Sequence, residues 1–451
     1  MTDAAARDGA IGPRRVLAIA LPVVLSNATV PIQGAIDTAV IGNLGSEVYL
    51  AAVGLGAILF SILFGIFNFL QMGSSGLAAQ ALGARDGARV NETLARAVVL
   101  ALLIAGCLIA LRGVLRDVGL GLFEGSDDVR RLAAVYIDIR IWAAPAELAN
   151  YALLGWFSGQ ELTNRLFRQQ VFLSLCNIAL NVLLVVGFGY DIDGVAMGTA
   201  IAAYAGLGYG LWLAWPQWRA MRPEGWRLRP SAVLAPSRLI ALMKLNRDIF
   251  LRTVLLMAAF AWMTRLGSTL GDTVLAANVV LMQFFEISAY ALDGFAIAAE
   301  ALVGQAAGAR NSRRLRRAAI ETSLWSGLLA LAMAAGLHAV SGTVIDGFTN
   351  VAEVRAVARE YAVWAALTPA VGFAAFQLDG IFVGATRARD MRDAMVVSAL
   401  VYFPSSWLLT QLLGNTGVWL GLHVLLVVRA ISLLARYPGM ERQLDAATPD
   451  R

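Results

Sequence analysis

The chain has few of the residues on which enzymes and secreted proteins commonly depend. It contains two cysteines and two histidines in 451 residues, and only 15% of its residues are charged. Cys107 and Cys176 lie in apolar runs without CxxC spacing, which excludes a disulfide framework and a cysteine-based zinc site. His338 and His423 have no ligand spacing, and the sequence contains no P-loop for ATP. We therefore expect no enzyme, no metal site and no cofactor.

Hydrophobic residues are what the chain has in excess. They make up 59% of the sequence, and the mean hydropathy is +0.67. Stretches of about 20 apolar residues are long enough to cross the hydrocarbon core of a bilayer as helices. The predicted segments are 16–42, 48–82, 93–115, 132–158, 169–189, 194–216, 248–266, 274–306, 317–340, 357–385, 393–413 and 416–435. The sequence therefore predicts an all-α integral membrane protein with 12 transmembrane helices.

Basic residues concentrate in alternate loops between the predicted helices. The largest clusters lie in 216–247, in 310–317 and from Arg429 to the C-terminus. Loops rich in Lys and Arg mark the cytoplasmic side of a membrane protein. This bias places both termini in the cytoplasm, and it accounts for the basic pI of about 9.5 without a nucleic-acid partner.

An internal repeat divides the chain. QALGAR at 80–85 recurs as QAAGAR, and GWFSG at 155–159 recurs as GIFVG, each 225 residues later. GVAMG at 194–198 recurs as GVWLG after 223 residues, and LGS at 44–46 recurs after 222. A repeat of this period indicates two copies of one structural unit.

Each copy holds six predicted spans, so the two copies have the same orientation in the membrane. Parallel repeats of this kind are a transporter architecture, with the substrate path between the halves. We predict two pseudo-symmetric six-helix lobes, at 1–215 and 248–451, the second ending in a short cytoplasmic tail. A polar, proline-containing linker at 216–247 joins them on the cytoplasmic side.

Asp37 is an acid within the first predicted span. A charge at the centre of a membrane helix costs roughly 2.5–3.5 kcal/mol on insertion scales, and the repeat places Ala259 at the equivalent position. The fold therefore does not require the acid. A carboxyl group in apolar surroundings favours its neutral form, so Asp37 can bind and release a proton. The alternative is that Asp37 is an interfacial acid near the helix end.

Other residues of the first predicted span belong with Asp37. Gln33 lies one helical turn earlier and faces the same way, and Pro22 and Pro31 suggest a hinge in this helix.

Asn177 and Asn181 are four residues apart in the fifth predicted span, so they share one helix face. Buried amides need hydrogen-bond partners. The pair therefore indicates either a polar pocket or hydrogen bonds that hold neighbouring helices together.

The second lobe has its own charged residues within its predicted spans. Asp293 and Glu300 are seven residues apart on one helix face, Asp379 lies on a later span, and Arg252 lies at a depth similar to that of Glu300. Because unpaired charges are rare inside membranes, we predict an Arg252–Glu300 ion pair. The network either locks the lobe or forms a second proton or substrate site.

The chain resembles the DinF-type branch of the multidrug and toxic compound extrusion (MATE) transporters. The resemblance covers nearly the whole chain and rests on segments in both halves: DTAVIGNLGS, MGSSGLAAQALGARD, NYALLGWFSGQ, NIALNVLLVVGFG, LDGFAIAAEALVGQAAGAR and LDGIFVGATRARDMRDAM. It implies two six-helix lobes around a central cavity. It also implies export of amphiphilic, often cationic compounds, driven by inward flow of protons or sodium.

The resemblance extends to site residues. Asn177 matches an asparagine that lines a pocket with the first-helix acid, but Asn181 stands where the family often has an aspartate. With one negative charge fewer, the site favours protons over sodium as the coupling ion. Tyr136 and Thr199 occupy positions where the family often has pocket-lining polar residues, although both could be ordinary structural hydroxyls.

These observations predict a proton-coupled efflux transporter with Asp37 as its coupling site. The alternative is a flippase for lipids or polyprenyl-linked glycans, since the wider superfamily includes such proteins. The expected partners are amphiphilic or cationic small molecules, protons or sodium, and membrane lipids. We expect a monomer in the bacterial inner (plasma) membrane.

Overall fold

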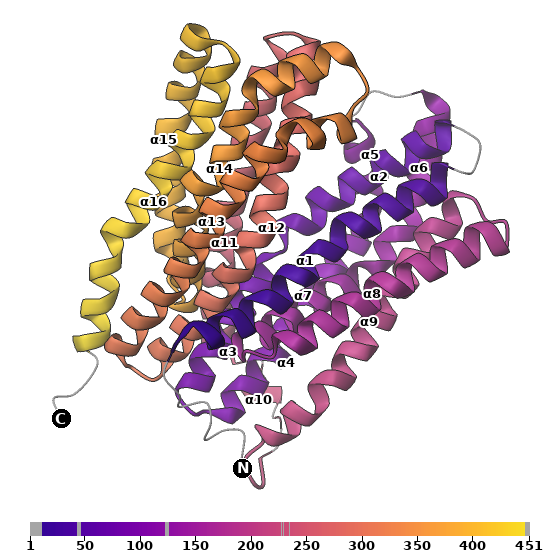
Figure 1. The fold of residues 1–451 in the computed structure, drawn as a ribbon. Coiled ribbons are helices and arrows are strands. Elements are labelled where there is room, and N and C mark those ends of the chain that lie inside the picture. Colours follow the sequence, from indigo (N-terminus) through magenta and orange to yellow (C-terminus); the bar gives the residue numbers. More distant parts are fainter. Residues whose placement is uncertain are drawn as a thin grey trace. The chain divides into compact units, whose positions relative to one another are not determined.

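The computed structural model describes residues 11–42, 47–121, 126–226, 228, 230–233 and 235–446. None of these residues is in a β-strand. The helices, drawn in Figure 1, are α1 (Pro13–Gly42), α2 (Glu47–Ile66), α3 (Phe69–Gly83), α4 (Gly87–Ala110), α5 (Arg112–Gly121), α6 (Asp127–Arg140), η2 (Ile141–Ala143), α7 (Ala144–Gly159), α8 (Thr163–Val182), η3 (Leu183–Gly187), α9 (Ile192–Ala220), α10 (Pro230–Val233), α11 (Pro236–Ser268), α12 (Asp272–Gly308), α13 (Ser312–Phe348), α14 (Ala352–Gly384), α15 (Ala388–Leu413) and α16 (Asn415–Ala446). Within these residues, 11 helical stretches are long and apolar enough to cross a membrane. The predicted all-α membrane fold is confirmed.

The remaining predicted span, 132–158, is interrupted. It corresponds to the end of α6, the 3₁₀ turn η2 and α7, which follow one another without a loop. Pro145 lies in the first turn of α7, where its missing N–H cannot continue the hydrogen-bond ladder of the preceding turn. Three charged residues, Asp138, Arg140 and Glu147, also lower the hydropathy of this segment.

Two hydrogen bonds show the direction of α8 relative to α1. Ser174 donates to the hydroxyl of Thr29 at 3.4 Å, and Asn181 donates to the carboxylate of Asp37 at 2.8 Å. From the first contact to the second, the residue number increases in α8 and also in α1, so the two helices run in the same direction. In a membrane this requires an odd number of crossings between them. The α2–α3 and α4 stretches supply two, so α6–α7 supplies the third, as the prediction of 12 spans requires.

The chain forms two compact units. The first unit comprises residues 25–242, and the second unit comprises 243–446 together with 11–24. The second unit includes the start of α1, where Arg15 Nη2 donates to Gln305 Oε1 of α12 at 3.4 Å. The predicted lobes and linker stay a prediction, but residues 11–24 pack differently from what that division implies.

The same glycine contact occurs in both units. In the first unit, a Cβ atom on Gly159 of α7 would collide with the carbonyl oxygen of Ser75 on α3. In the second, a Cβ atom on Gly384 of α14 would collide with the carbonyl oxygen of Glu300 on α12. Each pair is separated by 225 residues from its counterpart, and small residues let membrane helices approach this closely. The internal repeat is thus present in three dimensions.

The turn that follows α3 in the first unit is repeated after α12 in the second unit. Arg85 and Arg310 both have a left-handed backbone, with φ of 58° and 50°, although non-glycine residues rarely adopt it. Asp86 and Asn311 then cap the next helix, each accepting a hydrogen bond of 2.9 Å from the amide three residues later. The LGS motif at 44–46 lies outside the described residues.

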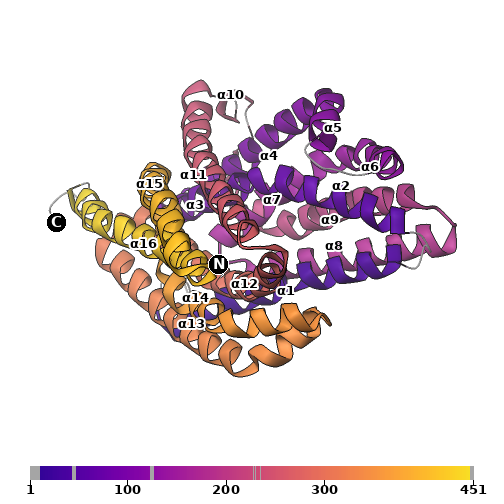
Figure 2. The same ribbon diagram turned by 90° about the horizontal axis from the view of Figure 1, so that it is seen from above.

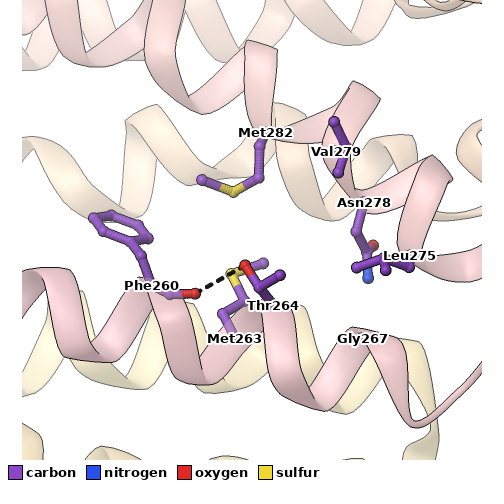
Figure 3. A pocket seen from close by; sticks show the side chains of 8 residues that line it. All are labelled: Phe260, Met263, Thr264, Gly267, Leu275, Asn278, Val279 and Met282. Atoms are coloured by element: carbon purple, nitrogen blue, oxygen red, sulfur yellow. Dashed lines mark hydrogen bonds between the residues drawn. The ribbon is translucent and has the colours of Figure 1, made fainter. Parts of the chain in front are cut away.

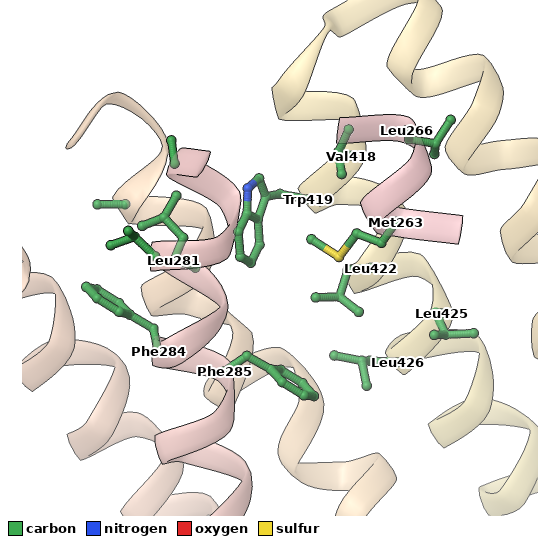
Figure 4. Close-up of a cluster of buried hydrophobic side chains, with 14 of the residues drawn as sticks. Met263, Leu266, Leu281, Phe284, Phe285, Val418, Trp419, Leu422, Leu425 and Leu426 are labelled. Carbon is green, nitrogen blue, oxygen red and sulfur yellow. The ribbon is translucent and has the colours of Figure 1, made fainter. Parts of the chain in front are cut away.

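The core of the second unit contains buried residues of all six helices from α11 to α16. Figure 4 shows Met263 and Leu266 of α11 in one cluster with Phe284 of α12 and Trp419 of α16. Lipid tails are as apolar as these side chains, so the cluster is stabilised by close van der Waals packing rather than by removal from water. Figure 2 shows the helices of this unit from above.

Candidate functional site

The carboxylate of Asp37 belongs to a cluster with Asn177 and Asn181. The side-chain amide of Asn181 donates to Asp37 Oδ1 at 2.8 Å and to Asn177 Oδ1 at 3.2 Å. Both asparagines are fully buried, with 0% exposure, whereas Asp37 is half-buried. We call these three residues the carboxylate–amide cluster. The structure therefore brings together the three residues predicted for coupling, although their role in coupling stays a prediction.

The backbone around Asn181 departs from a regular α-helix and is closely approached by a neighbouring helix. Directly after α8 the chain continues as a π-helix, η3 (Leu183–Gly187), a rare form that is frequent at functional sites. On α9, Gly198 lies so close that a Cβ atom there would collide with Asn181 Oδ1. The glycine of the GVAMG motif therefore leaves room for the amide.

The three residues predicted to line a pocket have different surroundings. The side chain of Gln33, one helical turn before Asp37, interacts with its carboxyl. Tyr136 is 4% exposed, and its ring meets that of Phe60 edge-on, with centroids 6.3 Å apart. Thr199 donates its hydroxyl to the carbonyl of Val195 in its own helix at 2.8 Å. Contact of any of them with substrate stays a prediction.

Arg140 is a further charged residue near the cluster. Its guanidinium lies over the rings of Phe60 and Phe64, at 5.5 and 6.0 Å from their centroids, and Nη2 is 3.5 Å from Glu147 Oε1. Its positive charge also acts on the carboxyl of Asp37. Both Arg140 and Glu147 lie within the predicted span 132–158, where a charged residue is the signal that could have identified them.

The second unit has a version of the cluster that lacks the carboxylate. Gly421, the counterpart of Gly198, approaches Ser406 and Tyr402 of α15; these residues lie 225 positions after Asn181 and Asn177. The hydroxyl of Tyr402 donates to the backbone carbonyl of Ala259 on α11 at 3.2 Å. The second unit thus makes the equivalent helix contact without a titratable group at the position of Asp37.

The predicted ion pair of Arg252 with Glu300 is wrong. Arg252 Nη2 on α11 instead pairs with Asp379 on α14, and Arg429 on α16 pairs with the same carboxylate. Asp379 and Arg429 are 5% and 2% exposed. Depth along the helices suggested Glu300, but pairing depends on rotation about the helix axes, which hydropathy does not show. This three-residue cluster ties α11, α14 and α16 together.

Arg429 was not recognised from the sequence as a site residue, because it was grouped with the basic residues near the C-terminus. Its apolar neighbours in VLLVVRAISLL were the signal that it lies inside a helix. Asp293 is exposed but interacts electrostatically with Arg252. Glu300 is buried on α12.

A small cavity opens between α11 and α12, with a volume of about 60 Å³. Figure 3 shows its lining, which includes Phe260, Thr264 and Asn278. Drug-binding pockets are typically about 300–1,000 Å³, while a water needs only about 10–15 Å³. This cavity can hold waters but not a drug. In the part of the chain that the structure describes, no three His, Cys, Asp or Glu residues group as metal ligands.

The chain is similar to known membrane transporters. A family model described as MatE matches residues 22–183 and 249–408. DNA damage-inducible protein F of Escherichia coli (strain K12) is 40% identical over 418 residues, covering 92% of this chain and 90% of that protein. The probable multidrug resistance protein NorM of Deinococcus radiodurans is 30% identical over 447 residues, covering 94% of each.

Solved structures show the same fold. A crystal structure of MATE in the bent conformation matches with a TM-score of 0.85 at 17% identity, covering 96% of both chains. An outward-facing conformation of a multidrug resistance MATE family transporter matches with a TM-score of 0.83 at 16% identity and the same coverage. The chain therefore belongs to the MATE family, whose members are multi-pass membrane transporters of small molecules and not enzymes.

Proposed function

We propose that this transporter exports amphiphilic or cationic compounds in exchange for protons, with Asp37 as the coupling site. The carboxylate–amide cluster carries the proposal, because it combines one carboxylate with neutral amide partners. Such a carboxyl can exist with or without its proton, whereas a hard cation such as sodium prefers several anionic oxygen ligands. The Deinococcus relative is described as a multidrug resistance protein, which supports a drug-like substrate.

Proton binding changes the balance of hydrogen bonds in the cluster. The amide of Asn181 has two acceptors, Asp37 and Asn177. A carboxylate accepts more strongly than a neutral carboxyl, so protonation of Asp37 weakens the contact between α1 and α8. We propose that α1 then bends at Pro22 or Pro31, which lack the amide hydrogens of a regular helix. A cationic substrate competes with the proton because both are stabilised by the charge of Asp37.

We prefer export to the alternative of a lipid or polyprenyl-linked glycan flippase. A flippase would need cations free to bind phosphate groups. Arg252 and Arg429 both pair with Asp379, and Arg140 lies 3.5 Å from Glu147. These buried cations are therefore compensated within the protein.

The proposal includes the location and the topology of the protein in the membrane. We place the protein in the bacterial inner membrane as a monomer, with both termini in the cytoplasm, because basic residues concentrate in alternate loops. We assign the lobes to 1–215 and 248–451 and the cytoplasmic linker to 216–247.

Transport in proteoliposomes tests the proposal. We expect an imposed proton gradient to drive efflux of a fluorescent cation by the wild type, and a sodium gradient alone to drive none. Asp37→Asn should abolish the response to protons, whereas Asp293→Asn, which removes a carboxyl of the second unit, should retain it. Unchanged rate and pH profile in Asp37→Asn would exclude this carboxyl as the coupling site.

A further inference from the structure

An open apolar groove runs along α13, α14 and α16 in the second unit. Its volume is about 730 Å³, and apolar side chains form most of its lining. Ile320, Leu324, Leu328 and Leu331 of α13 follow one another at helical spacing along it and are 61%, 56%, 50% and 61% exposed. Figures 1 and 2 show the three helices in this unit. The groove has the shape and chemistry to hold an acyl chain.

One end of the groove continues into a charged hollow. Arg316 and Ile320 line both spaces, so they adjoin. The hollow is also lined by Ser312, Arg313, Arg317, Glu321 and Asp445. It lies at the start of α13 and the end of α16, where the apolar sequence gives way to charged residues. This is the level at which lipid headgroups lie.

The charges of the hollow are only partly compensated within the protein. Arg316 forms an ion pair with Glu441, with Nε 2.9 Å from Oε1. Among the described residues, Arg313 and Arg317 have no carboxylate within ion-pair distance, and Glu321 and Asp445 have no cation within it, although the charge of Asp445 acts on Arg316. Two guanidinium groups and two carboxylates can therefore form direct ion pairs with a ligand.

We propose that this groove and hollow form a specific site for phosphatidylethanolamine. Arg313 and Arg317 would bind its phosphate, because guanidinium groups match phosphate oxygens in geometry and charge. Glu321 and Asp445 would accept hydrogen bonds from its primary ammonium group. The acyl chains would occupy the apolar groove. The site is separate from the carboxylate–amide cluster, and the proposal does not depend on the coupling ion.

Charge complementarity selects this lipid among the common ones. Phosphatidylglycerol has the phosphate but no cation, so the two carboxylates repel it. Phosphatidylcholine has a cation without N–H donors, so it cannot hydrogen-bond to them. The competing occupant within the protein itself is the C-terminal segment 447–451, which comes shortly after Asp445 in the chain and carries both positive and negative charge.

Native mass spectrometry of the full-length protein tests the site. The protein is titrated with phosphatidylethanolamine, phosphatidylcholine and phosphatidylglycerol of identical acyl chains. We expect phosphatidylethanolamine to bind about fivefold more tightly than the other two, as one or two exposed ion pairs provide. Arg313→Gln/Arg317→Gln should weaken the binding of all three lipids, because each of them carries the phosphate. The control Arg89→Gln/Arg389→Gln removes the same charge from exposed positions outside the groove and should leave binding unchanged.

Two further variants distinguish binding of the lipid headgroup from binding of the acyl chains. Glu321→Gln/Asp445→Asn should still bind lipid but should no longer prefer phosphatidylethanolamine over phosphatidylglycerol. Leu324→Trp fills the groove at an exposed position, so it should weaken binding of all three lipids without unfolding the protein. Equal binding of the three lipids by the wild type would overturn the proposal. So would an equal gain for all three after deletion of 447–451, since the tail would then be the occupant.

Discussion

The side-chain amide of Asn181 donates a hydrogen bond of 2.8 Å to the carboxylate of Asp37. In the corresponding helix pair of the second unit, Tyr402 donates to the backbone carbonyl of Ala259 at 3.2 Å. The repeat therefore uses one helix contact twice, once with a carboxylate and once without one. Matched substitutions in the two units can separate coupling from packing.

Gly198 and Gly421 provide such a pair. Gly198→Ala places a methyl group against Asn181 Oδ1, and Gly421→Ala places one against Ser406. Each should destabilise the protein by about 1–3 kcal/mol through overpacking, as measured by thermal unfolding in detergent. Only Gly198→Ala should also reduce proton-driven transport, by roughly tenfold or more, because it moves the amide off Asp37. Parallel losses of transport in both variants would contradict a special role for the first-unit contact.

Asn181→Asp tests why this chain should favour protons. The substitution adds a second carboxylate beside Asp37, and hard cations bind more tightly as anionic oxygen ligands are added. We expect sodium-driven transport to become measurable in the variant while the wild type shows none. Asn181→Ala is the control, since it removes the hydrogen bond without adding charge. If sodium drives the wild type and Asn181→Asp equally, the number of carboxylates does not decide the ion.

Arg429→Gln tests the buried cluster of the second unit. Removing one partner of a buried ion pair costs about 3–5 kcal/mol, so this variant should unfold at a clearly lower temperature. Arg389→Gln is the matched control, because its side chain is 82% exposed and 3.9 Å from Asp393; its stability should change by less than about 0.5 kcal/mol. A stable Arg429→Gln protein with impaired transport would instead assign the cluster a functional role.

Asp293→Asn distinguishes a second coupling site from a structural charge. Asp293 interacts with Arg252 electrostatically, but Asp379 is the direct partner of that guanidinium. We expect transport and its dependence on protons to be unchanged, and protein yield to fall modestly. A shifted pH profile of transport would show that this acid takes part in coupling.

The proximity of Asp37, Asn177 and Asn181 was an expectation from the resemblance to the MATE family, and periodicity and the repeat contributed two parts of it. The i, i+4 spacing of Asn177 and Asn181 fixed a shared face, and the absence of a counterpart at Ala259 singled out Asp37. The glycines at 159 and 384 were recognised only as part of the repeat, and the structure shows the close backbone contact that each permits.

Other features depend on information that periodicity does not contain. The partner of Arg252 is set by the rotation of α11 and α14 about their axes, so equal depth wrongly suggested Glu300. Arg429 lies within the predicted span 416–435 and has apolar neighbours, but it was grouped with the basic residues near the C-terminus, so its ion pair with Asp379 was not predicted. The π-helix after Asn181 has no sequence signal comparable to a proline or a cap.

In the proposed mechanism, substrate and proton compete for Asp37. This competition is measured as the protons released when a cationic substrate binds to the purified protein in weakly buffered detergent solution, followed with a pH-sensitive dye. We expect the wild type to release protons on binding near the pH at which Asp37 is protonated, and Asp37→Asn to bind without releasing any. Equal proton release from both proteins, or none from the wild type at any pH between 5 and 8, would contradict it.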